Sequence, residues 1–178
     1  MACAFTLDHY REILRAAREG GYRFAGFDGP PAPGDLLLRH DVDLSLEAAL
    51  DRLRVLGHRV GLHAVYPDAD LDGRFDRVVA WHNPEPAYMT APIDGAVNVM
   101  AETYFDPATY RSDSNQRWRS GCPHEELRAG AFPWLQVLVH PEIWVYPGET
   151  MGRTMEAMLD AQRAHRLALL ADDRIDLE

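Results

Sequence analysis

The stretch from Leu36 to Asp43, with the sequence LLLRHDVD, places the strongest constraint on the fold. Three consecutive leucines are typical of a strand buried on both faces of a parallel sheet. The strand runs into one arginine, one histidine and two aspartates, which are costly to bury unless they are paired or bind a metal. Because chemistry collects at the carboxyl ends of parallel strands, we interpret Asp41 and Asp43 as candidate site residues. The structural alternative is that Asp43 or Ser45 only caps a following helix.

Helical and apolar patterns alternate along the chain. Periodic apolar residues predict helices over 7–19, after the capping residue Thr6, over 45–56, and over 150–170. Short apolar runs predict strands at 36–38, 60–65, 78–81, 96–100, 109–114 and 134–139. This alternation predicts an α/β architecture with a largely parallel sheet or barrel. With 178 residues and 47% hydrophobic content, we expect one domain over residues 1–178.

The charge balance excludes several function classes. The formal net charge of −10 argues against nucleic acid and against an anionic membrane surface as partners. All 18 cationic side chains are arginines, so Schiff-base chemistry and a P-loop lysine are excluded. Cys3 and Cys122 form no disulfide framework or zinc ribbon, and we expect free thiols. The first 20 residues lack the pattern of a signal peptide, so we expect a cytoplasmic protein.

Three further apolar runs end in a histidine, namely His63, His82 and His140. If the strands are parallel, these histidines and the two aspartates lie at one rim. One carboxylate and two imidazoles leave a metal position open for water, as in hydrolytic sites. A further aspartate and histidine could then act as base and acid. The other histidines are weaker candidates for this site, and we expect His9 and His165 to be solvated.

Four segments carry a family resemblance when they are read in order. They are Arg39–Asp43, Leu56–His63, Ser112–Ser114 with Trp118, and Val139–Pro141 with Trp144. Together they resemble the polysaccharide deacetylase family (NodB-homology domains), in its intracellular branch that carries H-D-V-D. The resemblance implies a deformed (β/α) barrel. It also implies the metal-dependent removal of N- or O-acetyl groups from a sugar or a sugar-containing small molecule.

The resemblance also implies roles for individual residues. Asp43 matches the metal-binding aspartate, His63 the first metal-binding histidine, Asp41 the base and His140 the acid. The family's second metal-binding histidine lies four residues after the first, and here that position is proline. We therefore assign the third ligand to His82, with His40 as the substitute. The expected cofactor is a divalent metal, in the first instance zinc.

One departure concerns the connection after Asp43. In the family, a helix, a strand and a further helix usually separate the first two motif strands, whereas here only residues 44–56 do so. Either the barrel is shortened and incomplete, or a segment is missing from the chain. Unpaired strand edges must be covered or must pair with another subunit, so a homo-oligomer is one expectation.

Five residues are candidates for substrate binding or for support of the site, namely Arg39, His40, Asp113, Arg119 and Trp144. Asp113 could orient a catalytic histidine or could form an Asx-turn. Arg119 could bind an anionic sugar or could be solvated. Trp144 could stack on a sugar ring or could belong to the core.

Three rival functions remain open. A phosphatase or phosphotransferase could use Asp41 as its nucleophile, but such enzymes usually need a lysine. A glycosyltransferase could bind a metal diphosphate through D-x-D, but no nucleotide-binding stretch accompanies the motif. A non-catalytic member of the family could bind a sugar or a partner protein without turnover.

Overall fold

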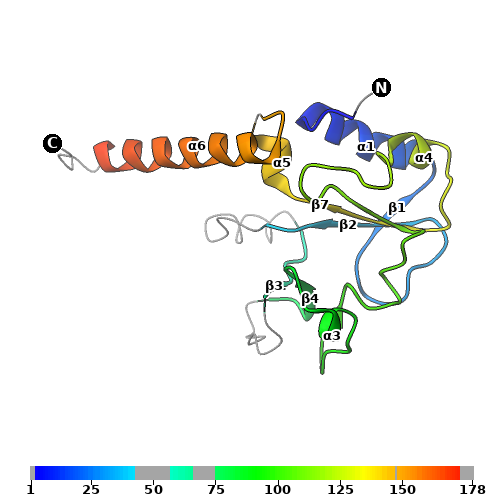
Figure 1. Cartoon of the computed structure of the whole chain (residues 1–178). Helices are drawn as coiled ribbons and strands as arrows, with labels where there is room; N and C mark the ends of the chain where they lie inside the picture. The colour runs from blue at the N-terminus through cyan, green and yellow to red at the C-terminus, as the bar shows by residue number, and fades with distance from the viewer. Residues whose placement is uncertain (1–2, 43–56, 66–74, 147, 173–178) are drawn as a thin grey trace.

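A computed structural model of the chain describes residues 3–42, 57–65, 75–146 and 148–172 (Figure 1). Within these residues the protein combines short helices with two parallel sheets, which confirms the α/β class. The predicted helix over 45–56 and the predicted metal ligand Asp43 lie outside the described residues.

The larger sheet has four parallel strands in the order β1-β2-β7-β6. The strands are β1 (Arg23–Ala25), β2 (Asp35–His40), β7 (Leu135–Val139) and β6 (Tyr110–Ser112). The leucine-rich strand β2 is a central strand, and its leucines Leu36 and Leu37 are almost fully buried. A strand in this position is covered on both faces, which is why its sequence is a continuous apolar run.

The smaller sheet has three parallel strands in the order β3-β4-β5. The strands are β3 (Leu62–Ala64), β4 (Val78–Trp81) and β5 (Val97–Asn98). All the predicted strands are present, although several are shorter than expected. In the described part of the chain the strands form two separate sheets and no closed barrel.

One face of the larger sheet packs against three helices, α1 (Leu7–Glu19), α4 (His124–Arg128) and α5 (Pro141–Val145) (Figure 1). Helix α1 begins and ends as its sequence predicts, because the Thr6 hydroxyl accepts the His9 amide and Gly20 ends the helix. Helices α4 and α5 are short, and the sequence pattern does not predict α5. The main hydrophobic core lies between these helices and the sheet.

The other face of the larger sheet turns toward the smaller sheet and helix α3 (Pro86–Met89) (Figure 1). Gln136 of β7 is fully buried there, and its amide donates to the carbonyl oxygens of Val99 and Tyr104. Side chains alternate between the two faces of a strand. Leu37, Arg39 and Asp41 therefore share the face that turns toward the smaller sheet.

Helix α6 (Met151–Asp172) projects away from the body of the protein (Figure 1). The sequence places Met151, Met155, Met158, Leu159 and Gln162 on one face of this helix and predicts that the methionines fill the core. Met158 is buried and Met151 packs against the core, whereas Leu159 is 58% exposed. Among the described residues, the buried side chains of this helix, Thr154 and Met158, lie in its first turns. None of the helices in the described ranges is long and apolar enough to span a membrane.

Candidate functional site

Three neighbouring strands of the larger sheet, β2, β7 and β6, are each followed by a polar residue at their carboxyl ends. His40 lies opposite Val139 in the β2–β7 register, and the Asp41 amide donates to the Val139 carbonyl at 3.0 Å. The Asp113 amide donates to the Leu138 carbonyl at 3.3 Å. Asp41, Asp113 and His140 therefore follow adjacent parallel strands at their carboxyl ends, where the sequence predicts the site.

Asp41 is held by a buried arginine two residues earlier on the same face of β2. The Nε of Arg39 donates to Oδ1 of Asp41 at 2.6 Å, and its Nη2 donates to Oδ2. Both side chains are more than nine-tenths buried. This two-point contact fixes the plane of the carboxylate and compensates the burial of both charges.

The two histidines of the smaller sheet meet each other beside Asp41. Nε2 of His63 lies 3.1 Å from Nδ1 of His82. The other ring nitrogen of His63, Nδ1, lies 3.7 Å from Oδ2 of Asp41. The larger and the smaller sheet thus contribute to one polar cluster, Asp41–His63–His82, in which Asp41 and His82 follow β2 and β4 and His63 lies within β3.

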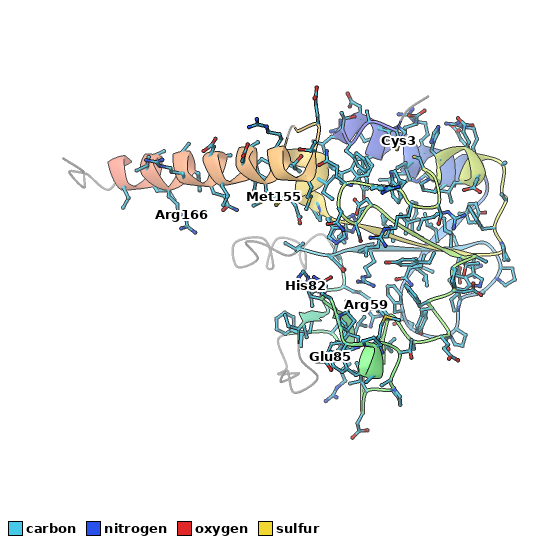
Figure 2. The ribbon with its side chains drawn as sticks, in the orientation of Figure 1. Cys3, Arg59, His82, Glu85, Met155 and Arg166 are labelled. Atoms are coloured by element: carbon cyan, nitrogen blue, oxygen red, sulfur yellow. The ribbon has the colours of Figure 1, made fainter. Side chains whose placement is uncertain are left out.

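The backbone around His82 sets the position of its ring. The His82 amide donates to the Ala64 carbonyl at 2.8 Å, which continues the β3–β4 pairing by one residue. Asn83 then adopts a left-handed φ of 47°, a conformation that asparagine tolerates better than most residues. Its side-chain nitrogen lies 3.3 Å from Nε2 of His82. Figure 2 shows His82 on the side of the molecule that carries the smaller sheet.

His140 is held by Asp113, whose side chain is completely buried. Oδ1 of Asp113 lies 2.6 Å from Nδ1 of His140, and the carboxylate also accepts the His140 amide at 3.1 Å. The indole nitrogen of Trp144 donates to Oδ2 at 2.6 Å. The turn after β6 is made by Ser112, whose hydroxyl accepts the Ser114 amide, so the Asp113 carboxylate is available to His140.

Trp144 and Arg119 occupy very different surroundings. Trp144 is 4% exposed and packs against Phe5 and Tyr10 in the core, where it supports Asp113 and presents no open face to a sugar. Arg119 is exposed in the segment between β6 and α4.

His40 turns away from the Asp41–His63–His82 cluster. It lies on the opposite face of β2 from Asp41, and its Nε2 lies 2.7 Å from the Tyr10 hydroxyl of α1. Loss of hydration within the protein lowers the pKa of His40, and the charge of His58 lowers it further. Of the two alternatives for the third metal ligand, His82 and not His40 lies beside His63.

A second group of potential ligands lies beside α1, and the sequence pattern does not predict it. Cys3, His9 and Cys122 place their ligand atoms within 4.8 Å of one another and could hold a metal ion. Both cysteines are free thiols, as expected. The expectation of a solvated His9 is wrong, because its side chain is only 12% exposed. The only local signal for this site in the sequence is Cys-x-His at 122–124, which does not indicate that Cys3 and His9 lie beside it.

Comparison with known proteins gives no independent indication of a family. No family model, curated protein or solved structure matches the chain.

Proposed function

We propose that the protein is a metal-dependent hydrolase that removes N- or O-acetyl groups from a sugar or a sugar-containing small molecule. The observation that carries this proposal is the approach of His63 to His82 beside Asp41, with His140 following the strand next to β2. The sequence resemblance to polysaccharide deacetylases assigns roles to Asp41, His63 and His140, and we assign His82 the place of the family's second metal-binding histidine. The proposal includes a NodB-type barrel, of which the two parallel sheets would be parts.

The donor set fits a zinc ion. In a tetrahedral site, two nitrogens that are each about 2.0 Å from zinc lie about 3.3 Å apart. Nε2 of His63 and Nδ1 of His82 lie 3.1 Å apart, so both could ligate one ion after a small movement. Asp43 would be the third ligand. When bound, the ion supplies Lewis acidity toward the acyl carbonyl and the attacking water.

Two side chains of the protein would move protons during the reaction. Asp41 would accept a proton from the attacking water, with its carboxylate held in place by Arg39. His140 would donate a proton to the leaving amine or alkoxide through Nε2, since Nδ1 is engaged by Asp113. A buried carboxylate on one imidazole nitrogen fixes the tautomer and the ring orientation, as in other acid–base histidines.

An acetate-release assay tests this function. The chain, freed of metal by a chelator, is incubated with acetylated amino-sugar oligomers with and without added Zn²⁺. We expect acetate release only with the metal, and a kcat lowered about 10²- to 10⁴-fold by His140→Ala or by Asp41→Asn. His165→Ala, on the exposed part of α6, is the matched control and should leave kcat unchanged.

Two outcomes would contradict the proposed hydrolase. One is a folded protein that binds the sugar without releasing acetate at any metal concentration, which would favour the non-catalytic alternative. The other is acetate release that is equally fast in His140→Ala, since the acid would then lie elsewhere.

A further inference from the structure

The start of the chain and the turn before α4 meet beside the first turn of α1. The Sγ of Cys3 lies 2.8 Å from Nε2 of His9, and the Sγ of Cys122 lies 3.2 Å from the same nitrogen. Nδ1 of His124 lies 3.2 Å from the Cys122 sulfur. Cys3, at α1, and His82, beside the smaller sheet, lie on different sides of the molecule (Figure 2). This group is therefore separate from the Asp41–His63–His82 cluster.

We propose that Cys3, His9, Cys122 and His124 form a second metal site, a structural zinc site that fastens α1 to α4. Two thiolates and two imidazoles are a ligand set typical of closed, tetrahedral structural zinc. The inference does not depend on the proposed deacetylase function, because it uses none of the same residues.

For Cys3, His9 and Cys122 the geometry requires only small movements, whereas His124, whose Nδ1 contacts the Cys122 sulfur, would move further to become the fourth ligand. In a tetrahedral site with Zn–S of about 2.3 Å and Zn–N of about 2.0 Å, a sulfur and a nitrogen lie about 3.6 Å apart. The two sulfurs of Cys3 and Cys122 already lie 2.8 Å and 3.2 Å from the His9 nitrogen. An ion at the centre of the group would move these atoms apart by less than about 1 Å.

Glu12 orients His9 in the way that metal-binding histidines require. Its Oε2 lies 2.8 Å from Nδ1 of His9, one turn away on α1. With the proton on Nδ1, the lone pair of Nε2 points at the two sulfurs. A carboxylate on the second ring nitrogen fixes the tautomer and makes the imidazole a stronger ligand.

Cysteine binds a metal ion as the thiolate, so metal binding at Cys3 and Cys122 would release their thiol protons.

The position of the group gives it a structural role. Its proposed ligands flank the contact between α1 and α4, where Gly20 lies so close to Leu127 that an added Cβ would overlap the Leu127 carbonyl. His9 also stacks on Trp144, which donates to Asp113. A metal bound here would hold α1 against the core that supports His140.

Cobalt binding tests the proposal directly. Reduced, metal-free protein is titrated with Co²⁺, and the near-ultraviolet thiolate-to-cobalt absorption is recorded. We expect one thiolate-bound cobalt per chain, with the intense visible bands of tetrahedral coordination, and competitive displacement by Zn²⁺. The Asp41–His63–His82 cluster contains no cysteine, so cobalt there cannot produce the thiolate absorption.

Variants assign the individual ligands. Cys122→Ser and His9→Gln should abolish or strongly weaken the thiolate absorption. Glu12→Gln should keep it but weaken cobalt binding about 10- to 100-fold, as for other outer partners of metal ligands. His63→Ala and His165→Gln are the matched controls, and both should bind cobalt with unchanged thiolate absorption.

A measurement on the unmodified chain covers the case in which a variant fails to fold. Zn²⁺ should protect both cysteines from alkylation, and a chelator should restore their reactivity. The proposal is overturned if reduced protein shows no thiolate absorption with Co²⁺, or if Zn²⁺ leaves the alkylation rates unchanged. It is also overturned if His63→Ala, rather than His9→Gln, removes the absorption.

Discussion

The contacts of Asp113 show how one buried carboxylate can hold a histidine in a fixed orientation. Its two oxygens accept donors from the His140 backbone, the His140 ring and the Trp144 indole. A completely buried carboxylate needs such donors, because an unpaired buried charge would be strongly destabilising. The sequence left two interpretations of this residue open, and only the fold brings it beside His140.

Asp113→Asn should lower both stability and activity. The new amide nitrogen would face one of the three donors, which leaves buried polar groups unpaired. We expect the free energy of unfolding to fall by about 1–3 kcal/mol. Acetate release, by the proposed function, should fall about 10²-fold or more because the imidazole loses its fixed tautomer. Urea denaturation and the acetate assay measure the two effects, with Ser114→Ala as the control. Full activity in folded Asp113→Asn would contradict the role given to Asp113.

His40 should make stability depend on pH in a defined direction. The pKa of His40 is lowered in the folded protein, so below about pH 6.5 the unfolded chain binds more protons than the folded chain. The contribution of His40 to the free energy of unfolding is present above the pKa that its imidazole has in the unfolded chain. It is lost as pH falls through the lower pKa that the imidazole has in the folded protein. The free energy of unfolding should therefore fall less between pH 7.5 and pH 5.5 in His40→Gln than in the unmodified protein. Urea denaturation at these two pH values, which bracket about pH 6.5, measures the difference. Parallel losses in the two proteins would show that His40 has no such effect.

At the scale of elements, local patterns predict the strands and the long helices well. Strand β4 and helix α1 have the predicted bounds, because their apolar periodicity and the Thr6 cap are local signals. The short helices α3 and α5 were not predicted, since four or five residues carry too little periodicity. The division into two sheets also has no local signal, because pairing between distant strands decides it.

The close pairing of β3 with β4 depends on Gly61. An added Cβ on Gly61 would overlap the carbonyl oxygen of Val78. We expect Gly61→Ala to cost about 1–3 kcal/mol of stability and to weaken metal binding at His63 and His82. Thermal denaturation and zinc titration of a Cys122→Ser background measure these effects. Gly152→Ala, where an added Cβ meets open space on α6, is the matched control and should be neutral or stabilising. Equal stability of the two alanine variants would contradict this account of β3 and β4.

At the scale of the whole molecule, local sequence patterns do not predict which distant residues of the chain come into contact. The group at Cys3, His9 and Cys122 joins residues that are more than 110 positions apart, and only the packing of α1 against α4 unites them. The Asp41–His63–His82 cluster is different, since each of its residues follows or lies within an apolar run. The sequence could therefore predict the Asp41–His63–His82 cluster but not the group at Cys3, His9 and Cys122.

Helix α6 divides into a packed part and an exposed part, and substitutions should separate them. Met158→Ala removes a buried side chain and should cost about 2–5 kcal/mol. Leu167→Ala, on the exposed part, should change the free energy of unfolding by less than about 0.5 kcal/mol. Urea denaturation of both variants checks the difference. A large loss in Leu167→Ala that depends on protein concentration would show that another subunit covers the helix, as an oligomer would require.

We propose above that one metal ion binds between the two sheets, near Asp41 and His140. The most direct measurement is a crystal of the protein saturated with Zn²⁺, with anomalous diffraction recorded at the zinc absorption edge. We expect a peak about 2.0 Å from Nε2 of His63 and from Nδ1 of His82, with an Asp43 oxygen as the third ligand. A zinc-saturated crystal without a peak at this position, in which the two imidazoles still contact each other directly, would contradict it.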